Sequence, residues 1–521
     1  MYTQEKKQLL ELGRPPRDYE NSVYTTWEIS LNQIQILSAT DRHAVYALEL
    51  LRTISFMHFE GISEQIFERA RKNLWDYVEG NMFSDTETAK IMSSGWNQLT
   101  LVKTLKILLD FSLITVDDCR RISMHPLVHE WSRQRMSLTE REQAWQMAVS
   151  TLAMSIYAGG CSDEEIKHKI MINPHIDACL DSPEGKKLMF ADGLRVVERY
   201  LIIDKFAEAY EESARTHHAL ALHSRNSRLK RLLLPSDNPS VLYTGRRQAY
   251  CLGELCRYEE AVKLQESIVE IMRLKTGASS PEAIIFCVMR ELAVFYVGWG
   301  KYEKGLGMLE EIVHSCHQTV GADDEITWDV KHSLAYCLYR LDRTKEAIKI
   351  QKQILQHSPS PKRIHALALF YTDLGKKAKA RKLQAPAIEE MISKYGEYHP
   401  WTLEHRTSAL NASRFMEKKT GIDARLENLE ILEANLGELH QNTILAMVVL
   451  ADGYIDRGFP LKSRQMRRRA VDCSIRLYGN DHPQTTALKK DLALIERAIA
   501  TRKICYWWLP DSIFASLFAH R

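Results

Sequence analysis

YGEYHPWT at residues 395–402 returns as YGNDHPQT at residues 478–485, and this repeated motif is the clearest indication of the fold. Its glycine, histidine and threonine recur with a step of 41 and then 42 residues, as Gly396, Gly437 and Gly479, His399, His440 and His482, and Thr402, Thr443 and Thr485. Gly277 and Gly321 extend the series upstream at a step of 44. A fixed period of this length predicts an array of repeated units.

A second marker lies between these phrases. Six short segments carry a charged or Gly-bearing turn followed by a small residue: DKFAEA, CRYEEA, GKYEKG, DRTKEA, GKKAKA and TGIDA. They end at Ala209, Ala261, Gly305, Ala347, Ala380 and Ala424, with steps of 52, 44, 42, 33 and 44. We interpret LLLPSDNPS (232–240), inside the longest step, as an inserted loop, and the sixth pair as degenerate.

Antiparallel helix pairs explain these residue types. One pair cannot bury both apolar faces alone, so each pair needs a neighbour. The small residue lets two helix backbones approach closely, Gly suits a left-handed cap at a helix C-terminus, and the Pro of His-Pro is tolerated in a first helical turn. We therefore predict a mainly α fold with a right-handed α-solenoid of about seven helix pairs over residues 186–503.

The array resembles tetratricopeptide repeats in the longer form, of about 42 residues, found in kinesin light chains and many fungal signalling proteins. YGEYHPWT and YGNDHPQT look like the loop between repeats of that family. The resemblance implies a superhelix with a concave groove that binds other proteins.

Composition agrees with a helical, folded chain. The 521 residues are 45% hydrophobic, which is enough to bury a core. The net charge of +3 gives no overall attraction to nucleic acid or anionic membrane. The ten cysteines form no CxxC pair, which argues against a zinc module or disulfide scaffold. No signal peptide and no membrane span are visible, so a cytoplasmic location is expected, with the nucleus open.

Residues 21–137 show a different pattern of predicted secondary structure, without the repeated motif. Helical patterns at 22–34, 43–58, 61–78 and 97–110 precede SLITV (112–116) and RISM (121–124), which read as a β-hairpin. HPLVHEWSRQRM (125–136) returns to helix. Helices followed by a hairpin predict a small winged-helix domain. We place a lead-in at 1–20 before it, a helical connector at 138–185 after it, and an aromatic tail at 504–521 after the repeats.

SVYTTWEISLNQI, FSLI and ISMHPLVHEW resemble the winged-helix part of fungal NB-ARC proteins, the nucleotide-switched STAND family related to NOD-like receptors. The resemblance implies that Met124, His125 and Pro126 occupy the family's MHD-like position, a relict here because Pro replaces Asp. No GxxxxGK(S/T) motif occurs, and about 20 residues precede the domain. We therefore expect the C-terminal half of such a receptor, with the nucleotide-binding domain missing, that neither binds nor hydrolyses ATP.

Several groups of residues have a structural interpretation beside a functional one. His125 and His129 flank no glutamate, so a structural role outweighs a metal site. The helix at 97–110 has only Lys103 and Lys106 as cations, which disfavours DNA reading. The basic cluster Lys462, Arg464, Arg467, Arg468 and Arg469 is either a solvated helix face or a patch for an acidic partner. No catalytic motif appears, so we expect no enzyme and no cofactor.

The first helix of each pair should line the groove. Counting twelve residues back from the small residue of the second helix gives Ala249, Ala293, Ala335 and Ala368. We predict an inward set drawn mainly from the residues three before and one after these positions: Arg246, Tyr250, Arg290, His332, Tyr336, Tyr339 and His365. Aromatic and basic side chains favour a peptide partner with acidic and apolar groups, although some of them could only pack between pairs.

Three functions follow from these patterns. The leading hypothesis is a non-enzymatic scaffold whose groove binds a partner protein. The first alternative is a subunit or fragment of a nucleotide-switched receptor whose NTPase domain lies upstream or on another chain. The second alternative is a cargo adaptor like kinesin light chain, which predicts a heptad segment that the sequence lacks. The oligomeric state is open.

Overall fold

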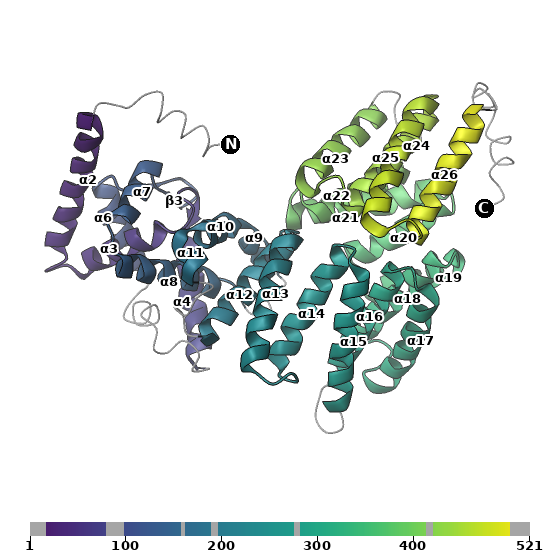
Figure 1. The fold of residues 1–521 in the computed structure, drawn as a ribbon, viewed down its shortest axis with the longest axis horizontal. Helices are drawn as coiled ribbons and strands as arrows, with labels where there is room; N and C mark the ends of the chain where they lie inside the picture. Colours follow the sequence, from purple (N-terminus) through teal and green to yellow (C-terminus); the bar gives the residue numbers. More distant parts are fainter. Residues whose placement is uncertain are drawn as a thin grey trace. The chain divides into compact units, whose positions relative to one another are not determined.

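The computed structural model describes residues 17–79, 98–157, 162–188, 196–275, 282–412 and 420–500. They form two compact units, residues 1–213 and 214–521. Most described residues are helical, with one small sheet, so the predicted mainly α class is confirmed (Figure 1). The predictions for the start of the lead-in (1–16), for Gly277 and for the tail at 504–521 fall outside the described residues.

The first unit combines short helices with the sheet. Its elements are α2 (Arg17–Leu37), α3 (Arg42–Ile54), β1 (Ile62–Ser63), α4 (Glu64–Glu79), α6 (Gln98–Asp110), β2 (Thr115–Val116), β3 (Arg121–Ser123), α7 (Pro126–Gln134), α8 (Leu138–Met154), α9 (Asp163–Met171), α10 (Asn173–Asp181), α11 (Pro183–Leu188) and α12 (Val196–Glu212).

The predicted hairpin is confirmed, with shorter strands than expected. β2 and β3 pair antiparallel with Val116 opposite Ile122. The sequence missed β1, which pairs with the other edge of β3 and places Ile62 opposite Ile122. Residues 62–63 were expected to begin a helix, but that helix begins at Glu64. A strand of two residues offers too short a pattern to separate from the first turn of a helix.

A buried ionic contact joins α4, α8 and α9. The Arg69 guanidinium pairs with the Glu165 carboxylate and also donates to the Ser155 carbonyl oxygen at 3.1 Å. Glu165 is 2% exposed and accepts from the Tyr157 amide at 2.9 Å. Removing one member of such a pair leaves a buried charge without its partner, so the contact locks the relative positions of these helices.

The second unit consists of successive helices. They are α13 (Thr216–Leu233), α14 (Pro239–Glu254), α15 (Tyr258–Lys275), α16 (Glu282–Gly298), α17 (Tyr302–Thr319), α18 (Glu325–Arg340), α19 (Thr344–His357), α20 (Pro361–Asp373), α21 (Lys377–Tyr395), α22 (Pro400–Ala412), α23 (Thr420–Leu436), α24 (Gln441–Asp456), α25 (Pro460–Tyr478) and α26 (Pro483–Ala500). Each helix packs on the next, and first helices also contact the first helix of the neighbouring pair, as α16 does with α18. The predicted helical-repeat solenoid is confirmed.

One local rule governs six of the turns that precede a second helix. Two residues before the second helix begins, the backbone has a positive φ, at Ala214, Cys256, Gly300, Asp342, Gly375 and Gly458. The fourth residue of that helix is small and buried, as Ala219, Ala261, Gly305, Ala347, Ala380 and Ser463. A Cβ on Gly305 would lie 2.7 Å from Cγ2 of Val297 and 3.1 Å from the Ala293 carbonyl oxygen, which confirms the predicted close approach.

Two sequence predictions need correction. DKFAEA lies within α12, so Ala209 does not follow a turn, and Ala219 of α13 takes the small position. The step from Ala219 to Ala261 is 42 residues, so the apparent step of 52 disappears. LLLPSDNPS is no insertion, because α13 ends at Leu233 and α14 begins at Pro239, with Asn238 as its N-cap. The sequence prediction chose Ala209 because α12 and α13 each carry an alanine at a spacing from Ala261 that is compatible with a repeat.

The loops between pairs confirm the role of the repeated phrase. Gly396 and Gly479 have φ of 95° and 94° with ψ near 165°, a region open to glycine, although it is not the αL region that we expected. The Nδ1 atoms of His440 and His482 accept from the amides of Asn442 and Gln484, both at 3.2 Å. Thr402, Thr443 and Thr485 are fully buried.

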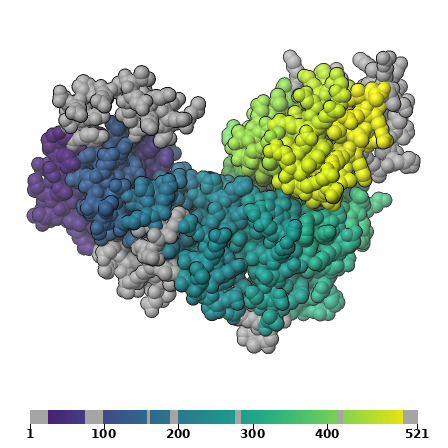
Figure 2. All heavy atoms as spheres, viewed as in Figure 1, coloured from purple at the N-terminus to yellow at the C-terminus, as the bar shows by residue number. Residues whose placement is uncertain are grey.

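Side chains fill the spaces between the ribbons of these pairs (Figure 2). One buried cluster contains Leu432 of α23, Met447 and Leu450 of α24, and Cys473 of α25. Another joins Ala335 and Leu338 of α18 to Phe370 of α20. In both places neighbouring pairs share one apolar core, as the repeat argument requires.

Candidate functional site

The first helices present a continuous row of side chains. Ala249, Ala293, Ala335 and Ala368 are fully buried, in line with the predicted register. The seven residues predicted from them are half-buried: Arg246, Tyr250, Arg290, His332, Tyr336, Tyr339 and His365. We call these seven residues the inner-row residues. Their partial exposure is compatible with ligand contact, and a role in binding stays a prediction.

Arg246 is engaged inside the molecule. Its Nε and Nη2 atoms donate to the two carboxylate oxygens of Glu291 on α16, at 2.7 and 2.6 Å. This bidentate bond raises the pKa of the Arg246 guanidinium. Gln265 of α15 also donates to the Glu291 carboxylate, at 3.2 Å. Arg246 therefore fixes α14 to α16, and its charge is compensated by Glu291.

Arg290 and Tyr250 are held less firmly. Nη1 of Arg290 is 3.5 Å from Oγ of Ser333 on α18, at the limit of a hydrogen bond. The Tyr250 ring has the Arg247 guanidinium 4.9 Å from its centroid. These contacts leave a cation and an aromatic ring on neighbouring first helices with part of their surface accessible.

The two histidines of the row are neutral. Burial lowers the pKa of His332 to about 4, and its Nδ1 atom shares a hydrogen bond with the Gln351 side chain at 3.1 Å. Burial together with neighbouring His405 lowers the pKa of His365 to about 3. The His365 and His405 ring centroids are 4.3 Å apart. These imidazoles supply hydrogen-bonding groups and no positive charge at neutral pH.

Tyr339 packs between pairs. Its ring lies 4.8 Å from that of Phe370 on α20, and burial raises the pKa of its hydroxyl group. The hydroxyl also bonds to the Asp373 carboxylate. Tyr336 lies 6.2 Å from Tyr339 by ring centroids and accepts from Arg340 at 3.4 Å. Tyr339 thus matches the alternative that some inner-row residues only pack between pairs.

A contact between distant repeats was not foreseen. The His482 ring donates through Nε2 to the Gly298 carbonyl oxygen at 3.0 Å, although 184 residues separate the two. Cys256 is 3.9 Å from the Gln441 side chain and also bonds to Tyr478. The turns at α14–α15 and α16–α17 therefore touch the loops before α24 and α26. No local pattern signals this contact, because its members belong to different repeats.

The residues at the MHD-like position make contacts that hold the local fold and the start of α7. Met124 is 2% exposed, and its amide donates to the Phe59 carbonyl oxygen at 2.7 Å. His125 is exposed and caps α7, accepting from the Leu127 amide through Nδ1 at 3.2 Å. Pro126 is the first residue of that helix. The nucleotide-sensing ancestry of these residues stays a prediction.

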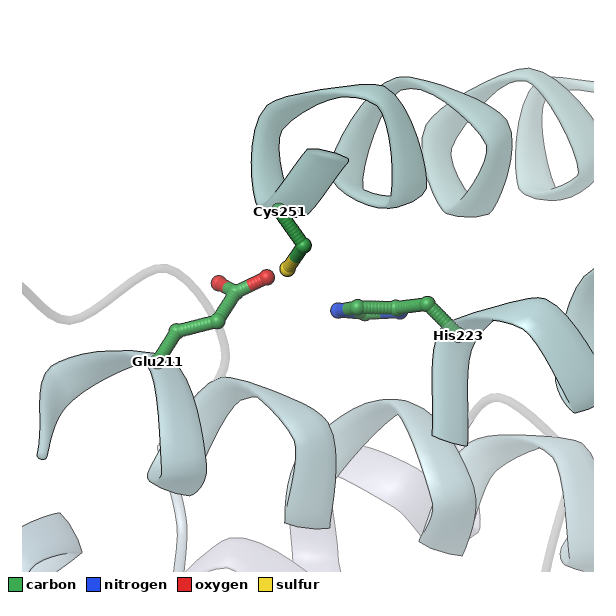
Figure 3. A group of neighbouring side chains, drawn as sticks. All are labelled: Glu211, His223 and Cys251. Atoms are coloured by element: carbon green, nitrogen blue, oxygen red, sulfur yellow. The ribbon is translucent and has the colours of Figure 1, made fainter. Parts of the chain in front are cut away.

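The sequence offers His125 and His129 as potential metal ligands, and such ligands also occur around His223 and Cys251. His129 is buried, its Nε2 atom contacts the Met57 carbonyl oxygen at 2.9 Å, and burial lowers its pKa to about 4. His125 is exposed at the start of the same helix, so the pair does not converge. Figure 3 shows His223 of α13 facing the Cys251 thiol of α14, with Glu211 of the first unit also drawn. His223 and Cys251 by themselves are fewer than the three or four protein ligands of a zinc site.

The helix considered for DNA reading is mainly a packing element. Leu101, Leu105 and Leu108 of α6 are buried. Lys106 pairs with Asp110 at 2.8 Å on the exposed side, which leaves Lys103 as the cation of this helix without an ion pair among the described residues. None of the described helices combines the length and apolarity needed to cross a membrane.

Sequence reasoning also missed a row of buried amides. Four residues after the small position, each of several second helices carries Gln or Asn with at most 1% exposure: Gln265, Gln351, Gln384 and Asn428. Gln265 and Gln351 donate to backbone carbonyl oxygens of the next first helix, at 3.1 and 2.8 Å. A recurrent Gln or Asn at this step is the signal that could have revealed them.

No protein-family model matches the sequence, and no curated protein matches it. Solved structures do show similarity. The Rap conjugation gene regulator of plasmid pLS20, in complex with the Phr* peptide, has 11% identity over 67% of this chain and 93% of that chain, with a TM-score of 0.48. The nearly identical TPR-like repeats of a Podosopora anserina protein, described as a kinesin light chain, have 22% identity over 36% and 93%, with a TM-score of 0.30.

A third structure is a STAND protein with a tetratricopeptide repeat sensor from Pyrococcus horikoshii. It has 13% identity over 86% of this chain and 59% of that chain, with a TM-score of 0.37. At these identities the similarity concerns the helical-repeat fold alone. The predicted relation to NB-ARC proteins stays a prediction.

Proposed function

We propose that the chain is a non-enzymatic scaffold whose first helices bind a segment of a partner protein. The observation that supports this most is the continuity of the row. Arg246 contacts Glu291, Arg290 contacts Ser333, Tyr339 contacts Phe370 and His365 contacts His405, each on the first helix of the next pair. One extended peptide could therefore contact several repeats in succession.

The chemistry of the row indicates the kind of segment. Arg290 has no ion pair among the described residues, whereas the charge of Arg246 is compensated by Glu291. Tyr250 and Tyr336 offer partly exposed aromatic rings. Arg and Tyr are favoured at binding hot spots because they combine large contact area with hydrogen bonding. A partner segment with a carboxylate near Arg290 and apolar side chains near the two tyrosines fits this surface.

A display library of random twelve-residue peptides, selected on the full chain, tests the proposal. We expect enrichment of peptides that combine acidic and apolar residues, with binding reduced at least tenfold by Arg290→Glu and about threefold or more by Tyr250→Ala. Lys349→Glu, on the exposed side of α19, is the control and should leave affinity unchanged. Selected peptides that bind all variants equally, or a library that yields no binder, would contradict the proposal.

The alternative of a nucleotide-switched receptor subunit needs separate evidence. It rests on the resemblance of residues 20–137 to a winged-helix domain, and the described elements α3, β1, α4, α6, β2 and β3 follow in an order compatible with that domain. Co-purification with a P-loop protein only in the presence of ATP would support this alternative. Tight ATP binding by the isolated chain would contradict both it and the scaffold proposal.

A further inference from the structure

Helix α25 carries six Lys and Arg side chains, of which one is buried and five are accessible. Arg467 is 7% exposed and pairs with Asp452 and with Asp491, the latter at 3.1 Å. It therefore belongs to the packing between α24, α25 and α26. The other cations of the helix lie on its accessible side: Lys462, Arg464, Arg468, Arg469 and Arg476. The basic cluster of the sequence is thus neither wholly structural nor merely a solvated face.

These accessible cations surround a depression of about 940 Å³. We call it the α25 groove and define it by its lining: Glu438, Tyr454, Leu461, Lys462, Arg464, Gln465, Met466, Arg468, Arg469, Asp472, Cys473 and Arg476. Its volume is at the upper end of the range of about 300–1,000 Å³ typical of ligand sites. A groove of this size can accommodate several side chains of another polypeptide.

The charge of the groove is positive. Five cations and two carboxylates line it. Arg464 has no ion pair or hydrogen bond among the described residues, and Lys462 lies 5.7 Å from the Tyr454 ring centroid and 5.4 Å from that of Phe459.

The remaining cations pair with half-buried carboxylates at the rim of the groove. Arg468 pairs with Glu496 at 2.5 Å, and Arg469 with Glu433 at 2.9 Å and Glu438 at 3.1 Å. Arg476 lies 4.0 Å from Glu438. Ion pairs at an accessible surface contribute only about 0–1 kcal/mol each, so carboxylates of a partner can compete for these cations.

Apolar side chains accompany the charges. Leu461 lines the groove and is 60% exposed, and Phe459, two residues before it, is 48% exposed. Tyr454 and Met466 are half-buried in the lining. A surface that joins uncompensated cations to exposed apolar groups complements a segment with both acidic and apolar residues. A nucleic-acid backbone fits less well, because Glu438 and Asp472 would repel its phosphates.

We propose that the α25 groove is a second docking site, separate from the inner row, for an acidic peptide segment with one or two apolar side chains. Leu461 and Arg476 are fifteen residues apart on α25, which corresponds to about 22 Å of helix. An extended segment of about seven residues spans that length. Its carboxylates face Arg464, Lys462 and Arg468, and its apolar residue packs on Leu461 and Met466.

Fluorescence anisotropy on the full chain tests the site. The probe is a labelled twelve-residue peptide with a central Leu-Phe pair flanked on both sides by Asp and Glu. The double variant Lys462→Glu/Arg464→Glu should weaken binding at least tenfold, and Leu461→Ser about threefold. The matched control is Lys345→Glu/Lys349→Glu on the second helix α19, where both lysines are exposed and have no ion pair among the described residues. It should change affinity less than twofold.

Further measurements separate the α25 groove from the inner row and from a nucleic-acid site. The measurements are repeated in the Arg290→Glu background, where the inner row no longer attracts an acidic segment. Probe binding that persists there and is lost when Lys462→Glu/Arg464→Glu is added belongs to the α25 groove, so the two proposals fail separately. If the charge-reversed double variant loses its helical circular dichroism, a photo-crosslinkable form of the probe on the wild-type chain replaces it and should label α25. Absence of probe binding, equal binding by wild type and double variant, labelling elsewhere, or a twelve-nucleotide RNA that binds as tightly as the probe would each overturn the inference.

Discussion

At the scale of single residues, the most consequential side chains are buried amides. Gln351 illustrates them: its Nε2 atom donates to the Arg363 carbonyl oxygen of α20 at 2.8 Å, while its Oε1 atom pairs with His332 of α18 at 3.1 Å. A buried polar group that loses its partner costs about 1–3 kcal/mol. One glutamine therefore joins two repeats and fixes the spacing between them, although its sequence neighbours give no hint of its partners.

Gln351→Ala should lower the free energy of unfolding by about 2 kcal/mol, because it leaves the Arg363 carbonyl and the His332 imidazole without their partner. Urea unfolding followed by circular dichroism measures the change. The matched control is Gln353→Ala, two residues away on the exposed side of α19, with an expected effect within about 0.5 kcal/mol. Similar losses for both variants would show that the buried amide does not connect the repeats energetically.

At the scale of the elements, each helix is defined by its ends. Second helices follow a residue with positive φ, and glycine supplies it at Gly300, Gly375 and Gly458 without steric cost. Ala214, Cys256 and Asp342 adopt it despite their Cβ atoms. The repeated histidine begins the following helix by accepting an amide hydrogen through an unprotonated Nδ1 atom, as in His440. The element boundary therefore depends on the protonation state of that ring.

The stability of the second unit should fall as pH falls from about 6.5 to about 4. Burial lowers the pKa of His440 to about 4, with a smaller effect from His217. The unfolded chain, with a histidine pKa of about 6.5, binds protons first, so this stabilisation is complete above pH 6.5 and is lost towards pH 4. The share of His440 is at most about 3 kcal/mol. Urea midpoints at pH 7.5, 5.5 and 4.5 measure the loss.

His440→Asn tests this share, because asparagine also caps helices well and does not titrate. The variant should retain wild-type stability at pH 7.5 within about 1 kcal/mol and lose less than wild type at pH 4.5. His332 and His365 keep their own lowered pKa values, so some pH dependence should persist. An unchanged pH profile in the variant would refute the role of the His440 cap.

At the scale of the second unit as a whole, the array contacts itself across distant repeats. Gly300 lies in the turn between α16 and α17, and a Cβ there would come 2.7 Å from Cγ of Pro483, the first residue of α26. His482 donates to Gly298 at the same place. A glycine is therefore required at residue 300 for two reasons, its φ of +80° and the approach of the distant loop.

Gly300→Ala and Gly375→Ala form a matched pair. Both glycines have positive φ, so each substitution should cost about 1 kcal/mol of stability. Nothing lies within 4 Å of a Cβ at Gly375, whereas a Cβ at Gly300 meets Pro483, which adds about 1–3 kcal/mol. Hydrogen exchange at residues 478–483 should accelerate in Gly300→Ala alone. Equal behaviour of the two variants would show that the contact between α16–α17 and α26 is weak.

The sequence alone was sufficient to predict the helical class, the period of about 42 residues, the β2–β3 hairpin and the buried positions of Ala261, Gly305, Ala347 and Ala380. These features are local, because spacing, small side chains and turn residues act within one helix pair. They can therefore be predicted from the sequence of that pair alone. Only the tertiary structure revealed that Ala219 replaces Ala209, that β1 joins the sheet, that Arg467 is buried while Arg464 is accessible, and that His482 contacts Gly298. Each of these features depends on which surfaces meet after the chain has folded. A periodic sequence pattern is the same in every repeat, so it does not specify which repeats contact each other.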